Sequence, residues 1–96
     1  MLQTKKIRIG RKNIAAYCMP LGKKKLIILK GRRGYVMCGY LSMKTADSLA
    51  DAAVLIKGVS SIREALGSQV YAVSRKAKNL GIKKGQDIKS ALKIIS

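Results

Sequence analysis

The sequence contains no histidine. Histidine is the commonest general base and a frequent metal ligand, because it changes charge near neutral pH. Its absence excludes histidine-dependent catalytic triads and histidine-containing metal sites. The two cysteines, Cys18 and Cys38, and four scattered carboxylates do not form the tight cluster of about four ligands that closes a zinc site. We therefore expect no metal ion and no cofactor.

Phenylalanine and tryptophan are also absent, and the four aromatic residues are all tyrosines. The core must then be aliphatic. The longest apolar runs, 26–29 and 52–56, are much shorter than the roughly 20 residues of a membrane-spanning helix. No secretory signal is recognisable in the first residues. These absences predict a cytoplasmic protein that does not enter a membrane and whose cysteines are free thiols.

Acidic residues are scarce, since only four oppose 21 lysines and arginines and leave a formal net charge of +17. Residues 1–44 contain 12 of the basic residues and none of the acidic ones. Such a field attracts polyanions, including nucleic acids. However, no aromatics alternate with the charges as base stacking requires, and no glycine-rich phosphate loop joins a strand to a helix. The charge predicts attraction but does not identify a partner.

Hydrophobic periodicity predicts four strands in the first 40 residues. They lie around Ile7 and Ile9 and over residues 14–19, 26–29 and 35–40. Turns rich in glycine and basic residues separate them. Strands joined in succession by short turns favour an antiparallel meander.

From Ser42 the apolar spacing changes to that of helices, and Ser42, Ser61, Ser74 and Asp87 are expected N-caps. The predicted elements are a long helix over 43–57, a short helix over 61–67, a strand over 70–73, and helices over 74–80 and 88–95. The order is β-β-β-β-α-α-β-α-α. We therefore predict an α+β fold of two layers, with a mainly antiparallel sheet of about five strands covered on one face by helices.

A chain of 96 residues has room for one core, so residues 1–96 are expected to form a single domain. Its high aliphatic content exceeds what a small core readily buries. We therefore expect a homo-oligomer.

The stretch Gly34–Leu41, with Met-Cys-Gly-Tyr-Leu at its centre, resembles the YunC-like family of domains of unknown function. The resemblance extends over most of the chain. It includes Pro20-Leu21, Leu26–Leu29, Ala46, Asp51–Ala53, Gly58-Val59, Ser74, Ala77, Leu80–Ile82, Gly85 and Ala91-Leu92. The resemblance implies a small bacterial or archaeal α+β domain, such as structural genomics projects select, and brings no activity or cofactor. It does not require Lys23–Lys25 or Arg32-Arg33, so the heavy charge is particular to this chain.

The segment after the fourth predicted strand is the best candidate for a pocket. Cys38 is followed by Gly39, which lets a ligand approach the backbone closely, and Tyr40 and Asp51 can supply polar groups. Each also has a structural interpretation. Cys38 can be a small buried hydrophobe, Asp51 a buried acceptor, and Tyr40 a packed ring with a solvated hydroxyl.

The basic turns are the second candidate, for contact with anions or nucleic acid. They contain Arg11, Lys12, Lys23, Lys24, Lys25, Arg32 and Arg33. In a meander, consecutive hairpin turns lie at opposite ends. Arg11 and Lys12 should therefore lie near Arg32 and Arg33, whereas the three lysines should lie at the other end.

Three functions remain open from the sequence. The first is a ligand- or protein-interaction domain with a pocket around Cys38, Gly39, Tyr40 and Asp51. The second is a basic protein that associates with nucleic acid. The third is an enzyme with Cys38 as its nucleophile. No catalytic residue is assigned.

Overall fold

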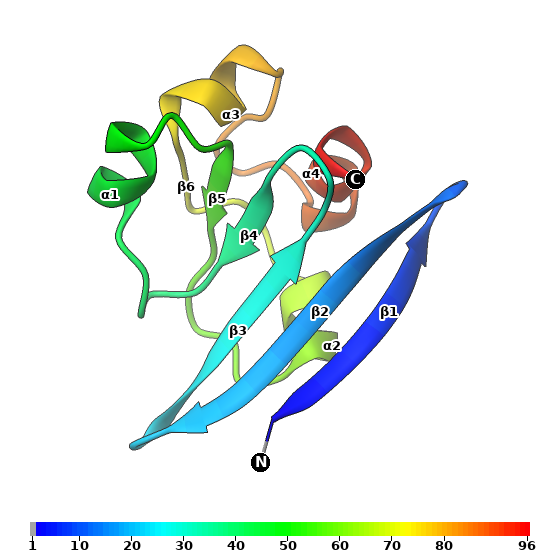
Figure 1. Ribbon diagram of the computed structural model, residues 1–96, viewed down its shortest axis with the longest axis vertical. Helices are drawn as coiled ribbons and strands as arrows, with labels where there is room; N and C mark the ends of the chain where they lie inside the picture. The colour runs from blue at the N-terminus through cyan, green and yellow to red at the C-terminus, as the bar shows by residue number, and fades with distance from the viewer. Residues whose placement is uncertain (1) are drawn as a thin grey trace.

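The structure, a computed structural model, describes residues 2–96 and contains one sheet of six strands (Figure 1). The strands lie side by side in sequence order. They are β1 (Gln3–Ile9), β2 (Lys12–Leu21), β3 (Lys24–Lys30), β4 (Tyr35–Met37), β5 (Ala53–Leu55) and β6 (Ala72–Val73). The helices are α1 (Met43–Ser48), α2 (Ile62–Leu66), α3 (Arg75–Asn79) and α4 (Ile88–Ile95). The predicted α+β class is confirmed. No helix in residues 2–96 is long and apolar enough to cross a membrane.

The first four strands form the predicted antiparallel meander. Its register places Ile14 of β2 opposite Ile7 of β1, and Cys18 of β2 opposite Ile27 of β3. Alternate residues of β2 are buried, which matches the period of two in the sequence. β4 ends at Met37, three residues before the predicted end of this strand.

The predicted long helix over 43–57 is wrong. α1 ends at Ser48, Ala50 adopts a left-handed conformation with φ of 57°, and the chain reverses into β5. β5 lies between β4 and β6, and it pairs with β4 in parallel. The sheet therefore has six strands, and the order becomes β-β-β-β-α-β-α-β-α-α.

The remaining helices begin where the sequence predicts. Ser61 and Ser74 accept hydrogen bonds from Glu64 N and Ala77 N, as N-cap side chains do. Asp87 precedes α4 but makes no side-chain capping bond. The strand predicted over 70–73 is shorter and begins at Ala72.

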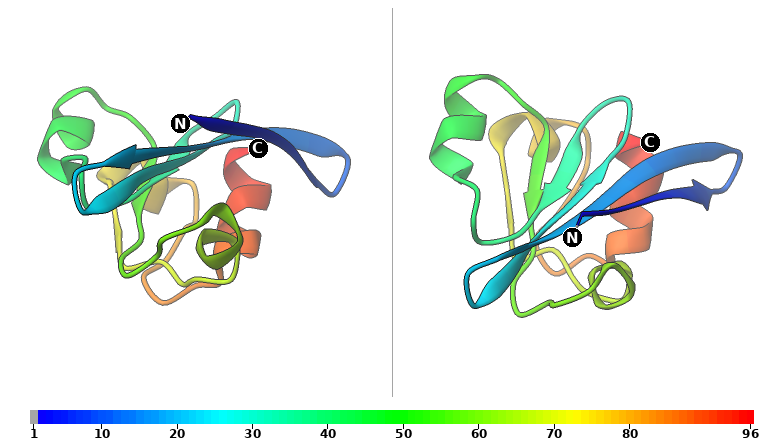
Figure 2. Two further views of the ribbon diagram at one scale, coloured as in Figure 1. Left: turned by 90° about the horizontal axis from the view of Figure 1, so that it is seen from below. Right: turned by 60° about the horizontal axis from the view of Figure 1, so that its bottom comes forward.

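Helices lie on both faces of the sheet, three on one face and α1 on the other (Figure 2). Buried residues of α2, α3 and α4 join those of the strands in the main core. α1 instead packs on the opposite face, where Ala46 meets Met37 and Ala53. The expected single helical layer therefore holds for three helices but not for α1. On the α1 face of β2 and β3, Tyr17 and Ile28 remain half-buried.

The loop between β3 and β4 fits tightly against two other segments. A Cβ on Gly31 would overlap the carbonyl oxygen of Ile95, and a Cβ on Gly34 would overlap that of Ala52. The backbone N–H of Gly31 also donates to the Gly34 carbonyl, at 2.8 Å. Only glycine permits this approach, so the loop is fixed to the end of α4 and to the start of β5.

Candidate functional site

A cleft of about 650 Å³ opens at the carboxyl ends of the parallel strands β4 and β5. The tip of the β2–β3 hairpin, at the lower end of the molecule in Figure 1, forms its third wall. The cleft is lined by Lys23, Lys24, Lys25, Cys38, Gly39, Tyr40, Ile56, Lys57, Gly58, Val59 and Ser60. Loops that leave the carboxyl ends of parallel strands form binding sites in many α/β proteins.

Cys38 contributes to the wall of the cleft but its thiol faces the protein. The residue is 6% exposed. Its Sγ accepts a hydrogen bond from Ile27 N at 3.4 Å and lies 3.9 Å from the Lys25 carbonyl oxygen. These contacts occupy the sulfur with the backbone of β3. The geometry therefore supports the packing interpretation of Cys38 over the nucleophilic one.

Tyr40 joins two walls of the cleft. Its hydroxyl donates to the Leu21 carbonyl at 2.8 Å and lies 3.4 Å from the Lys24 carbonyl. The side chain is nevertheless 48% exposed, so part of the ring remains available to a ligand. Next to it, a Cβ on Gly39 would meet no atom within 4 Å. The backbone at Gly39 therefore borders open space.

Every charged side chain that lines the cleft is a lysine. Lys23, Lys24 and Lys25 belong to the hairpin wall, and Lys57 comes from the loop after β5. The ammonium group of Lys57 lies 4.1 Å from the centre of the Tyr71 ring, a cation–π contact that orients it. The potential in the cleft is therefore positive, and negatively charged groups are favoured there.

Asp51 lies outside this cleft. Its carboxylate accepts a hydrogen bond from the Tyr35 hydroxyl at 3.0 Å, and its carbonyl accepts one from Ser74 Oγ at 2.7 Å. The structure thus brings together Cys38, Gly39 and Tyr40, and places Asp51 at the start of β5. The physical reason is the end of α1 at Ser48, since Asp51 follows the helix instead of belonging to it.

The Tyr35–Asp51 pair predicts a measurable pH effect. Burial raises the pKa of the Tyr35 phenol, and the hydrogen bond and negative charge of Asp51 raise it further. The folded state therefore holds this proton more tightly than the unfolded state. The contribution of Tyr35 to the free energy of unfolding is fully present below the ordinary tyrosine pKa of about 10. It is lost as the pH rises through the raised pKa of the folded state.

We expect Asp51→Asn to lower the pKa of Tyr35, because the substitution removes the negative charge. Ultraviolet absorbance during alkaline titration follows the phenolates of all four tyrosines, and the titration step that the substitution shifts is that of Tyr35. Asp47→Asn is the matched control, since Asp47 accepts from Arg75 N rather than from a tyrosine. Equal pKa changes in both variants would contradict a direct effect of Asp51.

The two groups of basic turns lie at opposite ends of the meander. Lys12 Nζ is 3.4 Å from the Ser96 carbonyl oxygen, and Arg33 N donates to the Ile95 carbonyl at 2.8 Å. Both residues therefore lie at the carboxyl end of α4, and Arg11 and Arg32 are adjacent to them in the chain. The lysines at 23–25 instead line the cleft.

The wall formed by Ile56–Ser60 was not predicted from the sequence. Its signal was the apolar run 52–56 followed by Lys57 and Gly58, which is typical of a buried parallel strand and its loop as well as of a helix. Recognising β5 would have placed Lys57 and Ser60 beside Cys38. In residues 2–96, no cluster of three or more His, Cys, Asp or Glu side chains is placed to hold a metal ion.

The fold and the cleft together define a small α+β domain with a lysine-lined cleft. Residues 37–95 match the domain of unknown function DUF1805, and because this is more than half of the chain, the protein belongs to that family. The match includes the loops after β4 and β5 but not the lysines of the β2–β3 turn. No curated protein matches the chain.

A solved structure similar to the chain is that of a protein of unknown function, TA1206 from Thermoplasma acidophilum. The two chains are 33% identical, with a TM-score of 0.96. The similarity covers 100% of this chain and 94% of the other. It extends the relationship to β1, β2 and β3, which precede the family match.

Proposed function

We propose that this protein is a binding domain for a small anionic ligand that occupies the lysine-lined cleft. The observation that carries the proposal is that four lysines and no carboxylate line one cleft. Its volume of about 650 Å³ lies within the range of roughly 300–1,000 Å³ for small-molecule sites.

The chemistry of the lining describes the ligand. Ile56, Val59 and the exposed part of the Tyr40 ring offer apolar surface between the lysines. A ligand with a phosphate, sulfonate or carboxylate group and an apolar portion matches this combination. The lining also lacks histidine and carboxylates, the side chains that most often act as general acids and bases. This composition supports binding over catalysis.

The test uses 8-anilinonaphthalene-1-sulfonate, an anionic aromatic probe that fluoresces when it enters an apolar site. We expect binding to the wild-type protein and competition by inorganic pyrophosphate. The double variant Lys23→Gln/Lys25→Gln should weaken the binding of both the probe and pyrophosphate by about tenfold or more. Each lost charge-assisted contact is worth roughly 1 kcal/mol.

The matched control is Arg11→Gln/Arg32→Gln, which removes two charges at the other end of the meander. Its binding of the probe should remain within about twofold of wild type. Equal losses in the two variants would show that net charge attracts the probe without a site, and would overturn the proposal.

Four narrower expectations remain predictions: the YunC-like assignment based on Met37–Leu41, a cytoplasmic location, a homo-oligomer and reactivity of Cys38. Sedimentation of a monomer at micromolar concentration would contradict self-association. Iodoacetamide labelling of the folded protein near neutral pH measures the reactivity of Cys38.

A further inference from the structure

We infer that a second surface binds the phosphate backbone of duplex nucleic acid. This surface, the basic corner, consists of Arg11 and Lys12 of the β1–β2 turn, Arg32 and Arg33 of the β3–β4 loop, and Lys93 in the last turn of α4. It lies at the end of the meander opposite the small-ligand cleft, so it is a separate site.

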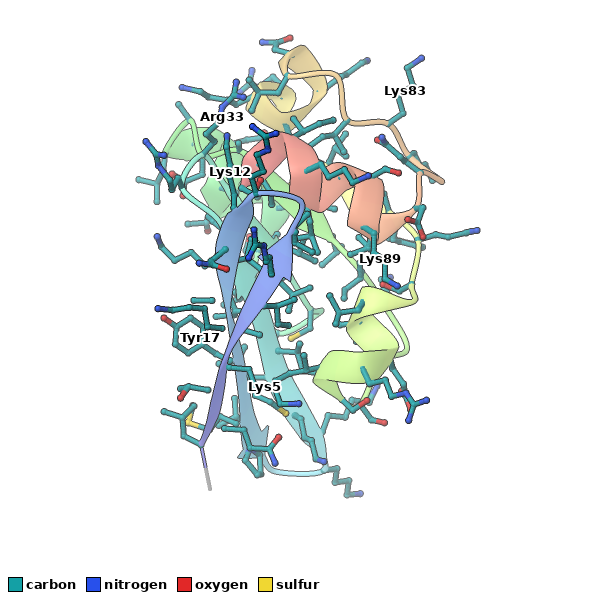
Figure 3. The ribbon with its side chains drawn as sticks, turned by 90° about the vertical axis from the view of Figure 1, so that its right-hand side faces the viewer. Lys5, Lys12, Tyr17, Arg33, Lys83 and Lys89 are labelled. Atoms are coloured by element: carbon teal, nitrogen blue, oxygen red, sulfur yellow. The ribbon has the colours of Figure 1, made fainter. Side chains whose placement is uncertain are left out.

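The fold holds these like charges together. Lys12 contacts the Ser96 carbonyl, and Arg33 bonds the Ile95 carbonyl through its backbone N–H and the Ile94 carbonyl through its side chain, at 3.3 Å. Figure 3 shows Lys12 and Arg33 near each other over the end of α4. The carbonyls at the end of a helix carry partial negative charge, which offsets the repulsion between the cations.

The loop that carries Arg32 is fixed in place. The close approaches of Gly31 to Ile95 and of Gly34 to Ala52 hold it at both ends. Arg32 is exposed between these two anchored glycines, and Arg11 is exposed in the tight turn beside Lys12. Because these backbone positions are fixed, less conformational freedom is lost when the arginines bind a rigid partner.

The four side-chain carboxylates leave this charge unneutralised. Asp47 accepts from the Arg75 backbone, Asp51 from the Tyr35 hydroxyl, and Glu64 from the backbone and hydroxyl of Ser60. Asp87 immediately precedes α4, at the end opposite the corner. Three of these side chains thus bond neutral groups and none bonds the basic corner, so the charges of Arg11 and Arg32 remain available to an external anion.

The side chains of the corner favour duplex nucleic acid as its partner. The large hydrophobic residues that are exposed lie elsewhere in the chain: Leu2, Tyr40, Leu41, Leu49 and Tyr71. A membrane-binding surface needs apolar side chains that enter the lipid, and a single-strand site needs aromatic rings for base stacking. The corner offers neither. Arginine forks suit phosphate groups, and we expect contacts to the backbone without sequence preference.

The test measures fluorescence anisotropy of labelled duplex DNA and duplex RNA across a salt series. Arg11→Gln/Arg32→Gln removes the two arginines that are not bonded to α4. We expect the slope of log affinity against log salt to become shallower by about 1.8 for DNA, or about 0.9 per lost contact. Affinity at about 0.1 M salt should fall at least tenfold.

Lys23→Gln/Lys25→Gln is the charge-matched control, because it also removes two charges but at the opposite end. It should leave the slope nearly unchanged, and thermal unfolding should show that both variants are folded. Equal slope changes in the two variants would show that only net charge acts. Absence of duplex binding near physiological salt, or preference for phosphatidylserine vesicles over both duplexes, would also overturn the inference.

Discussion

Replacing Gly34 with alanine is expected to lower the free energy of unfolding by about 3 kcal/mol, the upper part of the range for overpacking a close-packed site. The added Cβ would overlap the Ala52 carbonyl oxygen and would lie 2.9 Å from Ala52 Cβ. Neither neighbour can move freely. Ala52 is buried, and its carbonyl accepts a hydrogen bond from Tyr35 N at 3.0 Å.

The alanine can therefore be accommodated only if the loop shifts away from β5. That shift breaks the hydrogen bond with which β4 and β5 begin their parallel pairing. For a chain of this length, 3 kcal/mol corresponds to a fall in Tm of roughly 12 °C or more. Urea unfolding followed by circular dichroism measures the same change at constant temperature.

Gly39→Ala is the matched control, since its Cβ would meet nothing within 4 Å and its φ lies outside the left-handed region. We expect a change within about 0.5 kcal/mol. Gly31→Ala should resemble Gly34→Ala, because its Cβ would overlap the Ile95 carbonyl. A Gly34→Ala protein as stable as Gly39→Ala would mean that the loop is not held between α4 and β5.

The sequence was most informative where one local signal decides the structure. The alternation of buried and exposed residues along β2 predicts a strand because its period of two cannot fit a helix. Ser61 and Ser74 predict helix starts because their side chains bond backbone N–H groups three residues later. These signals are local and need no knowledge of the partner segment.

The parallel strand β5 could not be predicted in the same way. Ala53 and Val54 point to opposite faces of β5, and both are buried. The strand therefore shows a continuous apolar run instead of an alternation of apolar and polar residues. Ala46, Leu49, Ala50 and Ala53 also fit a helical spacing. Only the position of β4 beside it decides between the two structures, and that is a tertiary contact.

The candidate site depended on the same distinction. Cys38, Gly39 and Tyr40 are neighbours in sequence, so their common position at the cleft follows from the end of β4. Asp51 was grouped with them as a polar residue of the helix predicted over 43–57, which the structure replaces with α1 and β5. The wall that contains Lys57 exists only because β5 precedes it. The misplacement of Asp51 and the omission of this wall therefore have one cause, the helix predicted over residues that form β5.

Replacing Ser74 with alanine is the second change with a large expected effect. Its side chain is fully buried, and its Oγ accepts from Ala53 N at 2.9 Å and from Ala77 N at 3.2 Å. The hydroxyl also donates to the Asp51 carbonyl at 2.7 Å. This one oxygen therefore caps α3, holds Ala53 at the start of β5, and fixes the backbone at Asp51 just before that strand.

Alanine cannot supply any of these bonds, and water cannot replace them without opening the contact between α3 and β5. Each unsatisfied buried group costs about 1–3 kcal/mol, so we expect a loss of about 3 kcal/mol in all. Ser42→Ala is the matched control, because Ser42 is also an N-cap but is exposed and accepts only from Thr45 N. That change should cost about 1 kcal/mol.

The difference between the two serine variants isolates what Ser74 does beyond capping a helix. Urea unfolding of both proteins measures it directly. If the two losses are equal, the bonds to Ala53 and Asp51 contribute no stability. If Ser74→Ala is the costlier by about 2 kcal/mol, the bonds of this N-cap hydroxyl to Ala53 and Asp51 at the start of β5 contribute that difference.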